Sequence, residues 1–133
     1  MSDEGTELVH GRHFTREEAN AILPQLKEML LRLRDARDEL TDQEAHDVLS
    51  EAAPTNGGGD AARQVSVAFL EVRSLLGAIE ESGIVLRDLD RGLVDFPSVI
   101  DGREVYLCWE LGEDEVDFWH DLESGYRGRE PLD

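Results

Sequence analysis

The sequence predicts an α+β fold with three parts. These are a long antiparallel helical hairpin, a small antiparallel β-hairpin or three-stranded sheet, and a short C-terminal helix. Before Gly83, apolar residues recur every three or four positions in two segments, which is the period of a helix. After Gly83 the period becomes two, as in strands. The 133 residues suit one domain, and we expect a loose polar lead over residues 1–12, a single domain over 13–133, and a flexible loop at about 50–60.

The first helix is expected to begin near Arg16. Thr15 and Glu18 have the spacing of a capping box, in which each side chain accepts a hydrogen bond from the other residue's backbone N–H. Pro24 lies inside the segment and predicts a bend or a split. A second possible capping box, Thr41 with Glu44, predicts one or two further helical turns. The apolar positions form one near-heptad stripe: Ala19, Ile22, Leu23, Leu26, Met29, Leu30, Leu33, Ala36 and Leu40.

The second helix is indicated by Val65, Phe69, Val72, Leu76 and Ile79. Two long amphipathic helices joined by a loop favour an antiparallel hairpin, but two helices alone cannot enclose a core. The rest of the chain, or a second copy that completes a four-helix bundle, must cover them. We therefore expect a homodimer through the long helices.

The strand region contains Asp101-Gly102, a strong short signal for a β-hairpin turn. On the strand that follows, Val105, Leu107 and Trp109 should face one way, and Tyr106, Cys108 and Glu110 the other. Pro97 should end the preceding strand or mark an edge, because it has no N–H to donate. The segment "EDEVDFWHDLES" is interpreted as the short C-terminal helix.

The net charge is −18, from 31 acidic and 13 basic residues. This balance argues against nucleic acid and anionic membrane surfaces as partners, since both would be repelled. The sequence contains no run of about 18 apolar residues, so no membrane-spanning helix is predicted. The single cysteine, Cys108, excludes an intramolecular disulfide and a structural zinc site built from a cysteine cluster. The acidic N-terminus is unlike a signal peptide, so we expect a cytoplasmic protein.

Four stretches in the same order carry a resemblance to a known family: "FTREEANAILP", "RGLVDFPS", "REVYLCWELGEDE" and "FWHDLESGYRGREPL". Together they resemble the bacterial family named only "domain of unknown function 2203", over roughly Phe14 to Leu132. The resemblance implies no activity, because none is assigned to the family. It carries the following positions over to this chain: Thr15, Glu17, Glu18, Ala19, Asn20, Pro24, Gly92, Asp95, Phe96, Pro97, Cys108, Trp109, Gly112, Glu113, Trp119, His120, Gly125, Tyr126, Gly128 and Arg129. Asp117 falls where the family pattern is not fixed.

The segment around His120 is the first candidate site. On a helix, Glu113, Asp117 and His120 would share a face, and together they could hold a divalent metal ion. Further carboxylates could come from Glu17, Glu18 or Asp95. The alternative is a solvated acidic helix face with a histidine at its edge. In that case Glu113 only interacts favourably with the helix dipole at the first turn, and Glu18 only caps the first helix.

Three other features have two interpretations each. Asp95 lies opposite Val94 and Phe96 and so either faces solvent or pairs with Arg103 or Arg129. Cys108 has no adjacent base and is interpreted as a small buried residue. The "GYRGR" tail is either a strap held by Tyr126 and its arginines or a cradle for an anion.

Two functions follow from these observations. The first is a dimeric, non-enzymatic interaction or assembly module with a protein partner. The second is a metal-binding protein, such as a hydrolase, with a histidine and carboxylate site around His120. Bound metal after mild purification distinguishes them.

Overall fold

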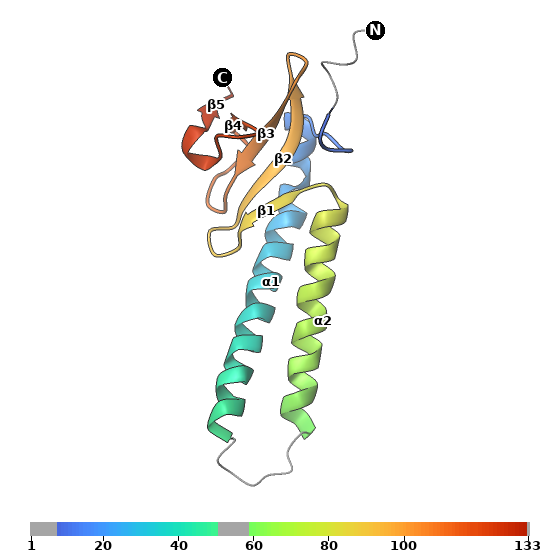
Figure 1. Ribbon diagram of the computed structural model, residues 1–133, viewed down its shortest axis with the longest axis vertical. Helices are drawn as coiled ribbons and strands as arrows, with labels where there is room; N and C mark the ends of the chain where they lie inside the picture. Colours follow the sequence, from blue (N-terminus) through green and yellow to red (C-terminus); the bar gives the residue numbers. More distant parts are fainter. Residues whose placement is uncertain (1–7, 51–58, 133) are drawn as a thin grey trace. The chain divides into compact units, whose positions relative to one another are not determined.

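The computed structural model describes the backbone of residues 8–50 and 59–132 and the side chains of 8–41 and 66–132. Over these residues the chain forms two helices and a five-stranded antiparallel sheet, so the predicted α+β class is confirmed (Figure 1). The sheet is larger than the predicted hairpin or three strands, because two short segments after the hairpin, β4 (Phe118–Asp121) and β5 (Glu130–Pro131), also join it. The contacts divide the chain into two compact units. We call Met1–Lys27 with Ile79–Asp133 the sheet unit, and Glu28–Ala78 the helical unit. The predicted loop at about 50–60 lies mostly outside the described residues.

Helix α1 (Arg16–Ser50) begins as the sequence predicts. The Glu18 amide donates to the Thr15 hydroxyl at 3.0 Å, and the Thr15 amide donates to the Glu18 carboxylate at 2.9 Å, which completes the capping box. The helix does not split at Pro24. One missing hydrogen bond is outweighed by the packing of Leu23 and Leu26, which are buried on either side of the proline.

The helical unit consists of the second part of α1 and most of α2 (Gly59–Glu81). The two helices run side by side in opposite directions (Figure 1), and Arg32 of α1 pairs with Glu71 of α2 at 2.8 Å. Their buried residues keep the helical period: Leu30, Leu33 and Ala36 on α1, and Ala68 and Leu75 on α2. The predicted antiparallel hairpin is therefore confirmed.

The helical turns predicted after Thr41 are present, but they are the end of α1 and not a new helix started by a second capping box. Thr41 lies within α1, and its hydroxyl donates to the Arg37 carbonyl oxygen one turn earlier at 3.1 Å. A hydroxyl bonded in this way is satisfied inside a helix and does not need to cap a new one.

The sheet unit contains strands β1 (Val85–Asp88), β2 (Leu93–Ile100), β3 (Arg103–Trp109), β4 (Phe118–Asp121) and β5 (Glu130–Pro131) in sequential order. Asp101 and Gly102 connect β2 to β3, and both have positive φ, 53° and 78°. Two positive φ angles match the right-handed twist of the flanking strands. The hairpin predicted from Asp101-Gly102 is thus confirmed.

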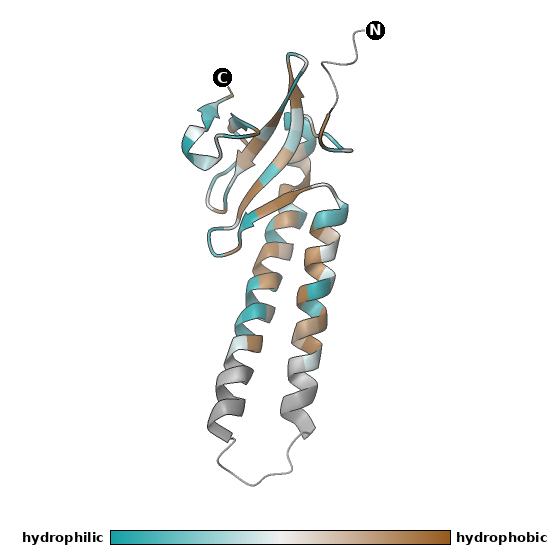
Figure 2. Cartoon of the chain, viewed as in Figure 1, coloured by the Kyte–Doolittle hydropathy of each residue, from teal (hydrophilic) through white to brown (hydrophobic). Residues whose placement is uncertain are grey.

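One face of this sheet forms the core of the unit. The predicted alternation on β3 is confirmed: Val105, Leu107 and Trp109 lie on this face, opposite Tyr106 and Cys108. Phe14 meets Phe96 of β2 edge to face at 5.2 Å, and the Lys27 ammonium lies 6.0 Å from the Trp109 ring. Figure 2 shows apolar residues in the central strands and along both helices. Fully burying one such large side chain contributes about 1.5–3 kcal/mol.

The predicted C-terminal helix is wrong. Phe118–Asp121 forms strand β4, which pairs with β3 through Tyr106 and His120, and Leu107 and Trp119. The segment is too short for a stable helix on its own, and β3 offers a row of backbone partners. As a consequence, Asp117 and His120 do not share a helical face.

Pro97 does not end β2, which continues to Ile100. Strand β1 pairs with β2 only as far as Asp95, so no neighbouring strand needs an N–H from Pro97 on that side. The Phe14 amide instead donates to the Pro97 carbonyl oxygen at 2.7 Å. The prediction that Pro97 marks a local edge is therefore confirmed.

Among the helices that the structure describes, none combines the length and apolar character needed to cross a lipid bilayer.

Candidate functional site

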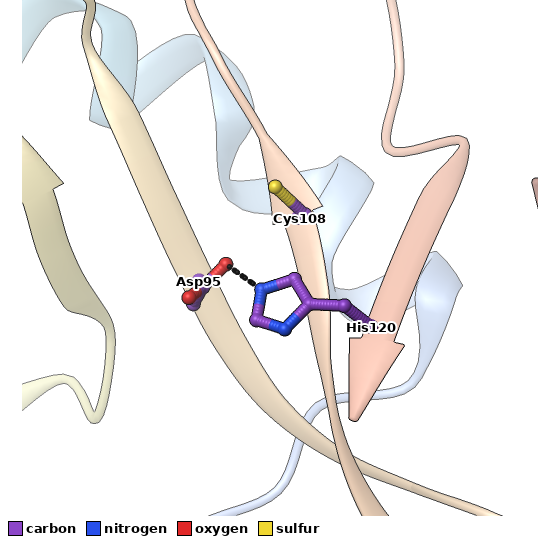
Figure 3. Close-up of side chains that lie close together, drawn as sticks. All are labelled: Asp95, Cys108 and His120. Atoms are coloured by element: carbon purple, nitrogen blue, oxygen red, sulfur yellow. Dashed lines mark hydrogen bonds and ion pairs between the residues drawn. The ribbon is translucent and has the colours of Figure 1, made fainter. Parts of the chain in front are cut away.

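The second face of the sheet carries a polar cluster made of Asp95, Cys108 and His120. These side chains come from β2, β3 and β4, three neighbouring strands (Figure 3). The register places Asp95 opposite Cys108, and His120 opposite Tyr106, so all point to one face. One potential ligand atom from each of the three residues lies within 4.8 Å of the other two. All three are buried.

His120 is held at both ring nitrogens. Nε2 lies 3.0 Å from Asp95 Oδ1, and Nδ1 lies 2.7 Å from the Asp121 carbonyl oxygen. A carboxylate and a carbonyl oxygen only accept hydrogen bonds, so both nitrogens donate and the ring is an imidazolium. Burial lowers the pKa of His120, but the hydrogen bonds to Asp95, Cys108 and the Asp121 carbonyl oxygen raise it to about 10.

Asp95 has a second partner in Arg87. Arg87 Nε donates to Asp95 Oδ2 at 2.9 Å, and the guanidinium lies 5.0 Å from the Tyr106 ring. The register between β1 and β2 shifts at this arginine, between Leu86 and Asp88. Such irregularities redirect side chains, and here the Arg87 side chain contacts Asp95 of β2 and Tyr106 of β3. The carboxylate of Asp95, only 2% exposed as a residue, is thus shared by two cations.

Cys108 lies between two cationic groups. Its Sγ atom accepts a hydrogen bond from Arg129 Nη1 at 3.7 Å, and it also interacts with the His120 imidazole. Cys108 is buried, as the sequence predicts, and it also has two polar neighbours in Arg129 and His120.

A cavity of about 310 Å³ opens beside the cluster. Its walls include all three cluster residues together with the following side chains and turn: Arg87, Leu93, Leu122, Glu123, Gly125 and Tyr126. The tail supplies part of this wall through the 3₁₀ turn η2 (Tyr126–Gly128). Tyr126 is fixed there, because its hydroxyl donates to Glu110 at 3.0 Å and its ring lies 4.2 Å from Arg91 and 4.6 Å from Arg129.

Two of the six metal ligands suggested by the sequence, Asp95 and His120, come together. Glu113 accepts from Arg129 and from the Glu110 amide, and Asp117 pairs with Arg16 at 2.7 Å. Glu17 and Glu18 are exposed on the first turn of α1, where acidic groups favour the helix dipole. The structure therefore places these four residues outside the cluster.

The structure also gives the contacts of three other features singled out in the sequence: Asp95, Asn20 and the tail. Asp95 faces neither open solvent nor Arg103 or Arg129: it is buried, and its carboxylate pairs with Arg87 and His120. Asn20 accepts from the Val116 amide at 2.7 Å and so joins α1 to the segment before β4. The tail contacts of Tyr126 and Arg129 support the strap interpretation of "GYRGR".

A second polar cluster was not found from the sequence. Glu104 of β3 accepts from the backbone amides of Val9 and His10 at 2.7 and 3.0 Å. Its Oε2 also lies 2.8 Å from His10 Nδ1 and 2.9 Å from His13 Nε2. Although burial opposes it, these bonds lower the pKa of Glu104 to about 2. The alternation of β3 was the available signal, since it places Glu104 on the face of Tyr106 and Cys108.

Comparisons with known proteins identify a family but no characterised relative. Neither the curated proteins nor the solved structures contain a significant match. A family model described as "Uncharacterized conserved protein (DUF2203)" matches residues 12–132, and this range includes Asp95, Cys108 and His120. Because the match covers nearly the whole chain, the protein belongs to the DUF2203 family.

Proposed function

We propose that the protein binds a divalent transition-metal ion of the zinc type through Asp95, Cys108 and His120. The observation that carries the proposal is the convergence of one oxygen, one sulfur and one nitrogen ligand within 4.8 Å, from adjacent strands, in a buried position. Zinc is bound by this set of donor types. Rigid strands are suited to holding such ligands in fixed geometry.

The environment of His120 supports the same proposal. In metal sites, the histidine nitrogen that does not bind the ion commonly donates to a backbone carbonyl or carboxylate. Here Nδ1 donates to the Asp121 carbonyl oxygen, which leaves Nε2 on the side of Asp95. The metal ion would replace the Nε2 proton between the two side chains.

Three protein ligands beside a cavity are characteristic of catalytic rather than structural zinc sites. Structural zinc sites use four protein ligands, whereas catalytic sites keep a position open for water or substrate. The cavity beside the cluster provides room for such a ligand. A metal-bound water at this position would act as the nucleophile in a hydrolytic reaction. The Cys108 thiol suits a reducing compartment, so we retain the cytoplasm as the proposed location.

The test is zinc binding by the purified chain. We expect one zinc ion per chain by elemental analysis, and His120→Ala and Cys108→Ser should each weaken binding by about 100-fold in a chelator competition. Glu17→Gln is the matched control, because this carboxylate is exposed and outside the cluster, and it should bind zinc as the wild type does. A wild-type chain that takes up no stoichiometric zinc, cobalt or nickel contradicts the proposal.

We also propose that the chain forms a homodimer through the outer face of α2. Val67, Phe69, Leu70 and Leu76 are 62%, 49%, 61% and 42% exposed in the helical unit, while Ala68 and Leu75 face inward. The stretch from Ser66 to Ala78 holds one acidic and one basic residue, Glu71 and Arg73, although the whole chain carries a net charge of −18. An apolar face that is poor in charge, on a strongly acidic protein, favours self-association over repulsion.

The dimer is tested by light scattering at about 10 µM protein. The wild type should have the mass of two chains, and Leu70→Glu should weaken the dimer at least tenfold by burying a carboxylate in the interface. Val99→Ser removes another exposed apolar side chain, 41% exposed, from the sheet unit and should leave the dimer intact. A monomeric wild type, or a dimer that survives Leu70→Glu unchanged, contradicts this proposal.

A further inference from the structure

The cavity beside the cluster has a wall with a distinct chemistry. Arg87 and His120 are its cationic residues, Leu93, Leu122 and Tyr126 supply apolar surface, and Glu123 is exposed on its wall. We infer that the cavity takes a short-chain monocarboxylate, whose acid group lies between the metal ion and Arg87. This inference rests on the proposed metal site.

Arg87 is prepared for such a ligand. Its Nε atom is bonded to Asp95 and its guanidinium lies over Tyr106, so its position is fixed before anything binds. Its side chain is nevertheless 44% exposed, and it lines the cavity. A guanidinium presents five N–H donors in a planar fork that matches a carboxylate. The bond to Asp95 uses the Nε–H group, so N–H groups on the two Nη atoms remain to bind a second carboxylate.

The charges of the inner wall favour a single negative charge on the ligand. A divalent ion bound by the Asp95 carboxylate and the Cys108 thiolate forms a neutral centre, and Arg87 then adds one positive charge. A monocarboxylate neutralises the charge of Arg87. The exposed Glu123 carboxylate adds one negative charge to the wall, so a phosphate dianion meets more repulsion there than a monocarboxylate does. Net charge in a partly buried site has a large effect because charges there are weakly screened.

The size and the apolar residues indicate the rest of the ligand. A cavity of about 310 Å³ lies at the small end of the range for ligand sites. The side chains of Leu93 and Leu122 and the ring of Tyr126 line it, and the ring is held between Arg91 and Arg129. These walls fit a few carbon atoms beyond the acid group. Butyrate therefore serves as the probe, with butyramide as its uncharged equivalent and inorganic phosphate as the competing anion.

The experiment uses the full chain loaded with Co²⁺, whose visible spectrum reports its coordination. Butyrate should change the cobalt spectrum in a saturable way, and butyramide and phosphate should require at least tenfold higher concentrations. Arg87→Gln should keep cobalt and weaken butyrate at least tenfold. Arg103→Gln, a matched arginine at the start of β3 and outside the cavity, should change the butyrate affinity less than twofold.

The outcomes separate this inference from the proposal beneath it. A chain that takes up no cobalt overturns both. The carboxylate inference is overturned if the spectrum of the cobalt-loaded chain does not change with butyrate, changes equally with butyramide, or changes more strongly with phosphate. In each of these cases the proposed metal site is not contradicted. Retention of full butyrate affinity in Arg87→Gln also overturns it.

Discussion

Replacing Asp95 by alanine is expected to destabilise the metal-free protein by about 3–5 kcal/mol at neutral pH. The substitution leaves the His120 imidazolium, which is 2% exposed, without its carboxylate. It also removes the partner of Arg87 Nε. Breaking a buried ion pair on one side costs more than the pair contributes, because the remaining group must either stay charged without its partner or give up its proton. Urea unfolding followed by tryptophan fluorescence measures the effect, since Trp109 and Trp119 both lie in the sheet unit.

A second variant separates the lost pair from simple loss of packing. In Asp95→Leu/His120→Leu both charges are gone, so the double variant should be more stable than Asp95→Ala by about 2 kcal/mol or more. Asp117→Ala is the surface control: Asp117 pairs with Arg16 but its side chain is 50% exposed, and it should cost less than about 1 kcal/mol. If Asp95→Ala costs no more than Asp117→Ala, the cluster does not contain a buried ion pair.

Replacing Glu104 by glutamine is the second substitution with a large expected effect. The Glu104 carboxylate accepts from two backbone amides and lies within 3 Å of nitrogens on His10 and His13. An amide has only one accepting oxygen, so Glu104→Gln should lose about 1–3 kcal/mol at pH 7. The backbone amides of Val9 and His10 should also exchange with solvent faster, which NMR measures directly.

The same substitution should remove part of the acid sensitivity of the protein. Because the pKa of folded Glu104 is about 2 and its ordinary value is 4.5, the unfolded chain binds more protons between those values. The stabilisation by Glu104 is therefore complete above about pH 4.5 and is lost as the pH falls towards 2. The difference in unfolding free energy between wild type and Glu104→Gln should shrink over this window. Glu123→Gln, at an exposed position, should leave the wild-type pH profile unchanged, and a constant difference for Glu104→Gln would contradict the assignment.

The helices and the hairpin were predictable because local patterns determine them. The capping box at Thr15 and Glu18 and the turn at Asp101-Gly102 depend on residues within a few positions of each other. The C-terminal helix was wrong for the opposite reason. Phe118–Asp121 has too few residues to show a clear period. Its conformation is determined by pairing with β3, a contact between residues ten or more positions apart in the sequence, which a local pattern does not reveal.

The candidate site was predictable only in part. His120 and Asp95 were identified because a charged or titratable residue among apolar neighbours needs a partner. Cys108 was missed as a third member, since its closeness to both depends on the register of three strands. Glu113 and Asp117 were chosen because a helical face would have aligned them with His120, and their arginine partners, Arg129 and Arg16, lie far from that face in sequence.

The proline on β2 has a consequence for aggregation. Open strand edges invite pairing with other chains, and natural sheets block this with prolines, charges and short strands. Past Asp95, β2 offers Pro97, which cannot donate, and Phe14 already occupies its carbonyl oxygen. At the opposite side, β5 is two residues long and ends in a second proline, Pro131. The sheet is thus poorly suited to joining a second sheet edge to edge.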